Sequence, residues 1–253
     1  MARYVLEVMY DGTCFHGSQV QGELQTVQLL VNKVLSTLYR TPMVTIGASR
    51  TDEGVHALSN FFHFDADTEP RPDLVYKCNA ILPSGMAVKN VYHAPYDFNA
   101  RFHAIERSYR YKIYAIKDPF LVNRALYYPF RMQEDLLHEA AAVLKGYSQF
   151  QSFAKRNSQV HTFDCTINTS RWERHGKELH YVVSANRFLR GMVRGLVATQ
   201  LRVARGSMDM ARLRQIIEAR DCTKAFFDVT GHGLYLEEVS YPEGILRPLG
   251  YFN

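Results

Sequence analysis

The sequence has no apolar run long enough to cross a membrane. Of its 253 residues, 47% are hydrophobic and 22% are charged, and no stretch approaches the roughly 18 to 20 apolar residues that a spanning helix needs. The first residues also lack the cationic region, apolar core and cleavage site of a secretory signal. We therefore predict a soluble, globular protein of the cytoplasm.

Cysteine is scarce, and no metal-binding pattern is visible. The four cysteines are far apart in sequence, so no CxxC or finger-like spacing exists. The ten histidines form no HExxH motif and no paired Cys/His pattern. These absences predict reduced thiols and neither a structural nor a catalytic metal.

Positive charge is in modest excess. The formal net charge of +5 is compatible with a polyanionic partner, but many ordinary enzymes are equally basic. A helix is expected over 189–205, and five arginines project there within a sector of roughly 120°. We interpret this row as a contact for phosphates or for a buried carboxylate, with a solvated helix face as the alternative. The row contains Arg187, Arg190, Arg194, Arg202 and Arg205.

The first half of the chain predicts the order β-α-β-β-α-β. Strands are expected over 3–10, 43–48, 60–64 and 87–92, with helices over 27–41 and 73–80. Thr26 is available as the N-cap of the first helix, and Pro42 stops it. This order is that of the ferredoxin-like fold, which many RNA-binding modules share.

The second half predicts a similar α+β arrangement. It has an alternating strand over 107–114, a helix over 133–145 capped by Gly146, and a hairpin over 163–185 that turns at 175–177. Two helices, over 189–205 and 210–219, precede a last strand over 234–241. We therefore predict an α+β protein with two ferredoxin-like (RRM-like) domains, 1–103 and 104–253. Their antiparallel sheets would join into one extended sheet, with the active-site cleft between the domains.

A polar loop at 49–56 is the strongest candidate for chemistry. An Asp followed two residues later by Gly is in most proteins a turn device, but the neighbours of Asp52 make the pattern specific. The segment Arg50-Thr51-Asp52-Glu53-Gly54-Val55-His56 resembles the catalytic loop of TruA-type tRNA pseudouridine synthases.

Further fragments that resemble landmarks of this family occur in the expected order along the chain. One resembles the strand with the active-site tyrosine, and another the helix segment with the active-site basic residue. The fragments are Tyr10-Asp11-Gly12, Asn79-Ala80 with Leu82-Pro83, Phe98-Asn99-Ala100-Arg101-Phe102, Tyr109-Arg110-Tyr111 and Met192-Val193-Arg194.

The resemblance implies an isomerase that converts uridine to pseudouridine without a cofactor or a metal. Asp52 would be the nucleophile, attacking either the uracil ring or the anomeric carbon of the ribose. Arg194 would form an ion pair that keeps this carboxylate ionised. Tyr109 would stack on the uracil and is a candidate base for the C5 proton, although without the resemblance it would be read as an ordinary sheet tyrosine.

The resemblance also implies a substrate, tRNA, modified at positions 38–40 of the anticodon stem-loop, and a homodimeric enzyme. Arg50 and Arg101 would bind the substrate, and Arg50 would help to flip the target nucleotide out of its stack. For Arg50, a surface arginine on backbone phosphate is the alternative. Other basic residues, including Lys155 and Arg156, could widen the RNA contact.

Two positions depart from the family pattern. Ser18 stands where tryptophan is usual, and Ser49 replaces a common glycine. Both are expected to border RNA-facing loops, which leaves the set of target positions open. A non-catalytic or narrowed-specificity RNA-binding paralogue is therefore one alternative. An RNA glycosidase is a weaker one, because its second carboxylate would be Glu53, which faces away from Asp52 in an extended chain.

Overall fold

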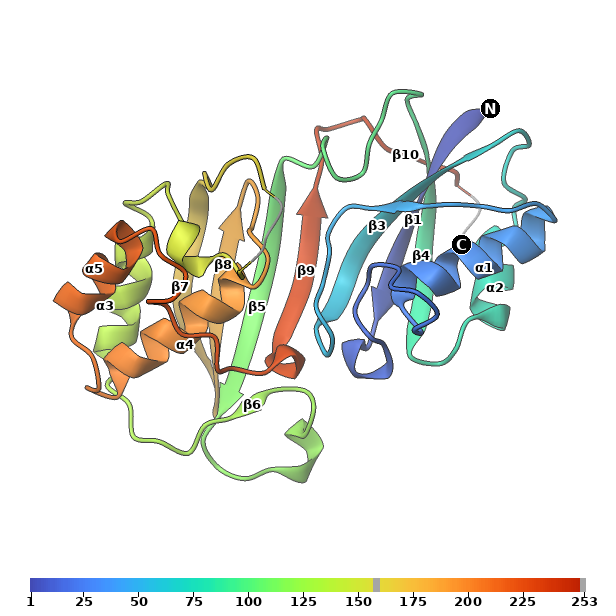
Figure 1. Ribbon diagram of the computed structural model, residues 1–253. Helices are drawn as coiled ribbons and strands as arrows, with labels where there is room; N and C mark the ends of the chain where they lie inside the picture. The colour runs from blue at the N-terminus through green and yellow to red at the C-terminus, as the bar shows by residue number, and fades with distance from the viewer. Residues whose placement is uncertain (157–159, 251–253) are drawn as a thin grey trace. The chain divides into compact units, whose positions relative to one another are not determined.

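The computed structural model describes residues 1–156 and 160–250, which divide into two compact units (Figure 1). The first unit contains residues 1–105 and the described residues from 236 onward, and the second unit is Glu106–Tyr235. In chain order the second unit is inserted between two segments of the first. The sequence-based division at 103/104 instead assigns the C-terminal segment to the second half, because periodicity alone does not tell which sheet a terminal strand joins.

The first unit is an antiparallel sheet with two helices. Strand β1 (Ala2–Tyr10) lies between β3 (His56–Ala66) and β4 (Met86–Ala94), and the short strands β2 (Ile46–Gly47) and β10 (Arg247–Pro248) pair with β3 and β4. Helices α1 (Val27–Tyr39) and α2 (Leu74–Ile81) lie together beside this sheet (Figure 1). Tyr39 of α1 packs edge-on against Phe64 of β3, with ring centroids 5.9 Å apart.

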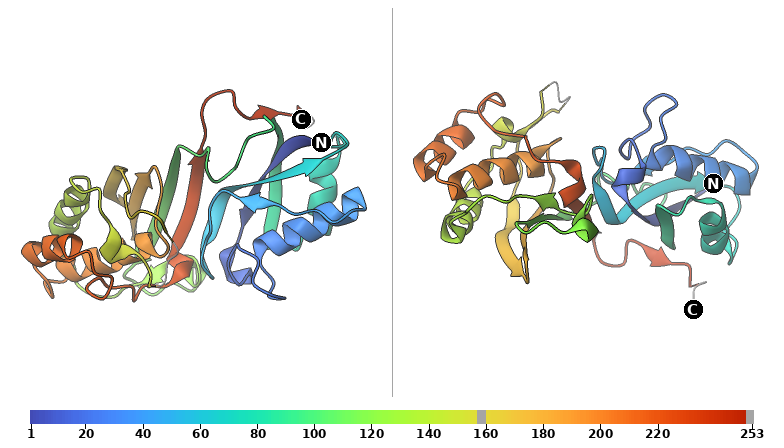
Figure 2. Two further views of the ribbon diagram at one scale, coloured as in Figure 1. Left: turned by 45° about the horizontal axis from the view of Figure 1, so that its top comes forward. Right: turned by 90° about the horizontal axis from the view of Figure 1, so that it is seen from below.

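The second unit has its own antiparallel sheet, in the order β5-β8-β7. Its strands are β5 (Glu106–Tyr114), β7 (Ile167–His175) and β8 (Glu178–Ala185), and β6 (Leu126–Tyr127) pairs parallel to β5. Helices α3 (Glu134–Leu144) and α4 (Met192–Ala204) cover one face, and α5 (Met210–Glu218) packs on α4 (Figure 2). The Trp172 indole donates a buried hydrogen bond of 2.9 Å to Gln200 of α4, which fixes helix against sheet.

Strand β9 (Leu234–Ser240) begins in the second unit and ends in the first. Within the first unit, the Ile105 N–H donates to Ser240 O at 2.9 Å, and the Tyr241 hydroxyl donates to Ala100 O at 2.7 Å. The remaining short elements are 3-10 turns. They are η1 (Gly12–Cys14), η2 (Pro119–Leu121), η3 (Gln151–Phe153) and η4 (Gly231–Gly233).

Most predicted elements are confirmed, including the α+β class and the strand and helix order of the first half. The Thr26 hydroxyl accepts from the Leu29 N–H and caps α1, which ends at Arg40 in the left-handed region, two residues before Pro42. The hairpin turns at Gly176 with φ +59°. In the described part of the chain, no helix is both long and apolar enough to span a bilayer.

Three local predictions are wrong. The strand expected over 43–48 is reduced to the two residues of β2. Helix α3 ends with Lys145 in right-handed geometry, so Gly146 is not a left-handed cap. Helix α4 begins at Met192, after Gly191 with φ +74°, and not at residue 189. The prediction started too early because the apolar spacing of α4 continues into the loop before it. In that loop, Gly191 adopts a left-handed conformation that turns the chain into the helix.

Candidate active site

The loop that carries Asp52 is fastened at its first residue by a buried amide. Asn60 of β3 is fully buried, and its side chain bonds both backbone groups of Ser49. Its Oδ1 accepts from the Ser49 N–H at 3.2 Å, and its Nδ2 donates to the Ser49 carbonyl at 3.0 Å. The same Nδ2 lies 3.1 Å from the hydroxyl of Tyr10, at the end of β1. The start of the loop is therefore fixed to two strands of the sheet.

Thr51, the residue before Asp52, is held by hydrogen bonds to Ser18 and Tyr10. Its N–H donates to the Ser18 hydroxyl at 2.8 Å, and its carbonyl accepts from the Ser18 N–H at 3.0 Å. Its own hydroxyl lies 2.8 Å from the Tyr10 hydroxyl. Thr51 and Ser18 are both buried, so these bonds are shielded from competing water.

The far side of the loop closes on the Tyr10-Asp11-Gly12 motif. The Val55 N–H donates to the Asp52 carbonyl at 3.2 Å around Gly54, whose φ is +79°. The Gly54 N–H donates to Gly12 O at 3.3 Å, and the Gly12 N–H donates to His56 Nδ1 at 3.2 Å. His56 is buried at the start of β3, and it anchors the end of the loop.

Along this loop, exposure follows the alternation of an extended chain. Arg50 is exposed, Thr51 is buried and Asp52 is partly exposed, so the side chains of Arg50 and Asp52 lie on the side away from the core. Glu53 is exposed, and its carboxylate lies 3.5 Å from His16 Nδ1. The loop thus presents the Arg50 guanidinium and the carboxylates of Asp52 and Glu53 toward solvent.

Arg101 lies in a second well-fastened segment of the first unit. The Ala100 N–H donates to His63 Nδ1 at 3.1 Å, and Asn99 Oδ1 accepts from the Arg101 N–H at 3.0 Å. The Arg101 side chain is exposed, with its guanidinium carbon 5.6 Å from the centre of the Phe102 ring. An exposed arginine beside an exposed aromatic ring is suited to contact nucleic acid.

Tyr109 and Arg194 both belong to the second unit, on the helix-covered side of its sheet. Tyr109, on β5, is 8% exposed, and its ring packs edge-on against Phe188 with centroids 5.1 Å apart. Arg194, in the first turn of α4, is partly exposed, and its Nε donates to Val229 O at 2.9 Å. Tyr111 lies two residues from Tyr109 and so on the same face.

Tyr111 and Arg194 bond the same backbone segment. The Tyr111 hydroxyl donates to Thr230 O at 2.8 Å, next to the carbonyl that holds Arg194. Burial raises the pKa of Tyr111, and the positive charge of Arg194 opposes this shift. The segment 229–230 is a positioning element that the sequence interpretation missed. The glycines at 231 and 233 were its only sequence signal.

The predicted row of five arginines is not a free phosphate-binding face. Arg187 and Arg190 precede α4. Arg202 donates to Asp228 at 2.8 Å and lies 3.9 Å from the centre of the Phe226 ring. The Arg205 guanidinium lies 3.8 Å from the centre of the Phe130 ring. Segments distant in sequence therefore occupy the end of the row, which helical periodicity could not reveal.

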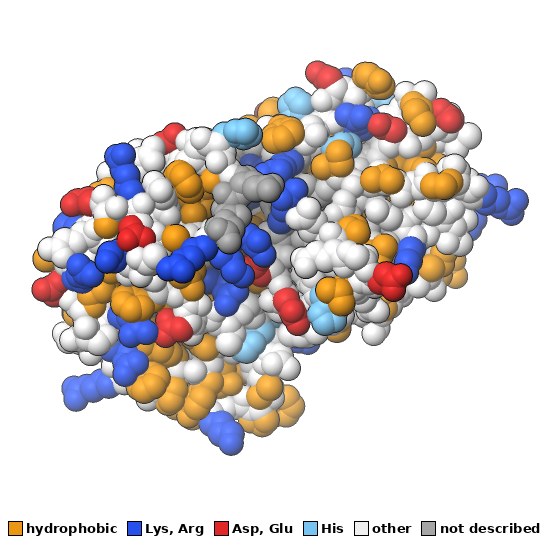
Figure 3. Space-filling model, viewed as in Figure 1, with side chains coloured by type: hydrophobic (Ala, Val, Ile, Leu, Met, Phe, Trp, Pro, Cys, Tyr) orange, Lys and Arg blue, Asp and Glu red, His pale blue; other side chains and the backbone are white. Residues whose placement is uncertain are grey.

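A basic patch is present elsewhere in the second unit, where η3 meets the start of α4. It consists of Lys155, Arg156 and Arg190, which are exposed, and the Lys155 N–H donates to Arg190 O at 2.9 Å. Figure 3 shows Lys and Arg side chains gathered on this face of the second unit. Their charges make the patch a candidate contact for phosphates.

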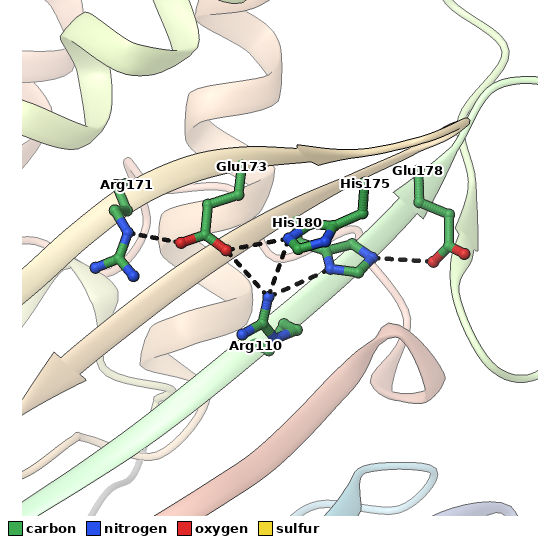
Figure 4. Close-up of polar contacts among 6 residues, drawn as sticks. All are labelled: Arg110, Arg171, Glu173, His175, Glu178 and His180. Carbon is green, nitrogen blue, oxygen red and sulfur yellow. Dashed lines mark hydrogen bonds and ion pairs between the residues drawn. The ribbon is translucent and has the colours of Figure 1, made fainter.

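The opposite face of the second unit's sheet carries a cluster of acidic and basic side chains whose charges offset one another (Figure 4). The Glu173 carboxylate accepts from Arg110 at 3.2 Å and from Arg171 at 2.7 Å. A hydrogen bond from His175, together with those from the two arginines, lowers the pKa of Glu173 to about 2, although burial opposes the shift. The His175 and His180 rings stack 4.4 Å apart. This cluster ties three strands together, and it contains none of the predicted catalytic residues.

Comparisons with known proteins identify the family. A family model described as tRNA pseudouridine synthase matches residues 140–242. The chain is 41% identical over 248 residues to tRNA pseudouridine synthase A of Parabacteroides distasonis, covering 96% of this chain and 97% of the relative. It is 39% identical to the Bacteroides thetaiotaomicron protein of the same name, covering 97% and 93%, and 33% identical to that of Staphylococcus saprophyticus, covering 98% and 94%.

The chain belongs to the TruA family of tRNA pseudouridine synthases. It is therefore an isomerase of the pseudouridine synthase class. The relatives match nearly the whole chain, so both units belong to the shared architecture. Arg50, Asp52 and Arg101 lie in the first unit of this family member, and Tyr109 and Arg194 lie in the second.

One departure from the TruA pattern has a different meaning from the one expected. Ser18 adjoins the Asp52 loop, but it is buried: only 2% of it is exposed, and its hydroxyl bonds the backbone of Thr51. Ser49 is partly exposed, as a loop-edge residue would be. Within residues 1–156 and 160–250, no group of three or more His, Cys, Asp or Glu side chains is arranged to hold a metal ion.

Proposed function

We propose that this enzyme isomerises uridine to pseudouridine in the anticodon stem-loop of tRNA, at positions 38–40, with Asp52 as the nucleophile. The observation that carries the proposal is the construction of the Asp52 loop. Hydrogen bonds hold Ser49 and Thr51 before Asp52, and the Gly54 N–H bonds Gly12 O after it. The Asp52 residue itself stays partly exposed. A nucleophile positioned in advance loses little conformational freedom when it reacts.

The reaction needs few groups, since no atom is gained or lost. The bond between the ribose C1′ and N1 of uracil breaks, and a bond between C1′ and C5 forms. The C5 proton leaves, and N1 takes up a proton. A carboxylate such as Asp52 can hold the separated fragment covalently, through the ring or through the ribose, while the base turns.

We propose that Arg194 and Tyr109 act on the same uridine as Asp52. A guanidinium near a sheltered carboxylate favours its charged, nucleophilic form. The Val229 carbonyl fixes the Nε of Arg194, so its position does not depend on substrate. Tyr109 would stack on the uracil ring, and its hydroxyl is the candidate base for the C5 proton.

We propose that the tRNA is read by charge and shape, with its target nucleotide flipped out of the stem. Arg50 is exposed two residues before Asp52 and is suited to fill the space that a flipped base leaves. Arg101 and the basic patch would contact backbone phosphates. As the family resemblance implies, the working form would be a homodimer in the cytoplasm.

The test is a product assay with purified protein and an anticodon-arm transcript, without added metal or nucleotide. We expect pseudouridine at the target positions, with Asp52→Asn abolishing its formation while tRNA binding stays within about twofold. Asp67→Asn is the matched control, because its side chain is 78% exposed and on a different loop. Wild-type protein that binds tRNA and leaves uridine intact would support the RNA-binding alternative. Release of free uracil would support the glycosidase.

A further inference from the structure

Ser18 connects helix α1 to the residue before the proposed nucleophile. The Ser18 carbonyl accepts from the Gln28 N–H at 3.0 Å, and the neighbouring Gly17 carbonyl accepts from the Val27 N–H at 3.3 Å. On its other side, Ser18 bonds both backbone polar groups of Thr51. A displacement of residue 18 would therefore be transmitted directly to position 51.

At Gly17, the two segments approach each other closely. A Cβ at Gly17, whose φ is +80°, would lie 3.0 Å from the Thr51 carbonyl oxygen. Next to this close approach, the short side chain of Ser18 brings an acceptor within hydrogen-bond distance of the Thr51 N–H. Without that hydroxyl, the buried Thr51 N–H would lose the partner that it has at 2.8 Å.

A second hydroxyl, that of Tyr10, contacts the side chain of Thr51. The Tyr10 hydroxyl contacts Thr51 Oγ1 and receives a hydrogen bond from Asn60, which also holds Ser49. The backbone of Thr51 is thus fixed by Ser18, and its side chain by Tyr10. Thr51 is joined directly to Asp52, so these bonds fix the backbone from which the Asp52 side chain extends.

We infer that Ser18 is a positioning residue of the active site, which sets the direction of the Asp52 carboxylate through the Thr51 backbone. This inference rests on the proposed function. Ser18 touches no reacting atom, and its hydroxyl acts only by fixing the geometry from which Asp52 attacks. Loss of this hydroxyl should lower the rate of the chemical step and leave the affinity for tRNA unchanged.

The experiment compares Ser18→Ala with Ser59→Ala. Ser59 is also a buried serine of the first unit, but its hydroxyl donates to Glu7 at 2.9 Å and not to the loop. Both variants should lose similar thermal stability. Only Ser18→Ala should lower kcat, by about tenfold or more, with KM for tRNA within about twofold. If Ser18→Ala does not fold, Ser18→Cys keeps a side chain of similar size with a weaker acceptor and should show the same loss of kcat.

A double-mutant cycle with Tyr10→Phe gives a second readout. Since both hydroxyls act through Thr51, their combined effect on kcat should be smaller than the product of the single effects. A kcat for Ser18→Ala or Ser18→Cys equal to that of Ser59→Ala, in an active wild-type background, would overturn this inference alone. A wild-type protein that makes no pseudouridine would overturn the proposed function together with it.

Discussion

The carbonyl oxygen of Val55 occupies the space in which a side chain at Gly12 would begin. A Cβ at position 12 would lie 2.1 Å from that oxygen and 2.7 Å from the carbonyl carbon of Gly54. Both obstacles are backbone atoms, so an alanine at this position must displace the loop. We expect Gly12→Ala to cost about 1 to 3 kcal/mol of stability and to reduce kcat at least tenfold, through movement of Asp52.

Gly146→Ala provides the matched control for Gly12→Ala. A Cβ at Gly146 would lie 3.4 Å from its nearest neighbour, and its φ is not in the left-handed region. This variant should unfold at or slightly above the wild-type temperature. The measurements are thermal unfolding and turnover of an anticodon-arm transcript. Wild-type turnover by Gly12→Ala would show that the contact between Gly12 and the loop does not position Asp52.

Buried His63 should make the stability of the enzyme depend on pH. Burial, assisted by the charge of Arg3 and opposed by that of Asp65, lowers the pKa of His63 from 6.5 to about 4. Between these values the unfolded chain binds a proton that the folded chain does not. Stability should therefore fall as the pH falls from about 6.5 to about 4, by roughly 3 kcal/mol in total from this group.

Urea unfolding between pH 4 and pH 7 measures this effect. His63→Gln keeps an acceptor for the Ala100 N–H and does not titrate, so its stability should change less over the same range. His16→Gln is the control for replacing a histidine by glutamine at an exposed position, since 52% of the His16 side chain is exposed. Parallel profiles for wild type and His63→Gln would assign the pH dependence to other groups.

Arg194 should affect chemistry more than binding. In the proposed ion pair, the guanidinium of Arg194 balances the negative charge of the Asp52 carboxylate, and its removal would take away that countercharge. We expect Arg194→Leu to lower kcat by about a hundredfold. Arg202→Leu is the control, because Arg202 lies on the same helix and bonds Asp228. Near-normal turnover by Arg194→Leu would reject the proposed ion pair.

Arg101 should contribute to tRNA affinity and not to the chemical step. Its exposed guanidinium would neutralise one phosphate, so Arg101→Ala should raise KM with kcat within about twofold. The slope of the logarithm of affinity against the logarithm of salt concentration should decrease by about 0.7 to 0.9. Arg71→Ala, also exposed and in the first unit, is the control. An unchanged salt slope for Arg101→Ala would exclude a phosphate contact there.

Much of the fold could be predicted because its signals are local. The alternation along β1 and β5, the cap at Thr26 and the turn at Gly176 each depend on neighbouring residues alone. The Asp52 loop could be identified because its motif is long and contiguous. Such features can be recognised in the sequence without knowledge of the tertiary structure.

The contacts that position the site could not be predicted, because they join distant segments. Nothing in the sequence near Ser18 indicates a buried acceptor for the Thr51 N–H, and nothing near Arg194 points to the Val229 carbonyl. The arginines of α4 failed as a prediction for the same reason, since the partners of Arg202 and Arg205 come from other loops. Periodicity predicts on which side of a helix a side chain lies, but it does not predict which residues from other segments contact that side chain.

The path of the chain through β9 has a consequence for synthesis on the ribosome. The second unit is continuous in sequence, so all of its residues have been translated before Tyr241 is made. The first unit lacks the Tyr241 hydroxyl that bonds Ala100, and the partner strand of β4 at 247–248, until residues 241–248 have left the exit tunnel. Nascent chains should therefore acquire protease resistance in the inserted unit first, although the N-terminal segment emerges earlier.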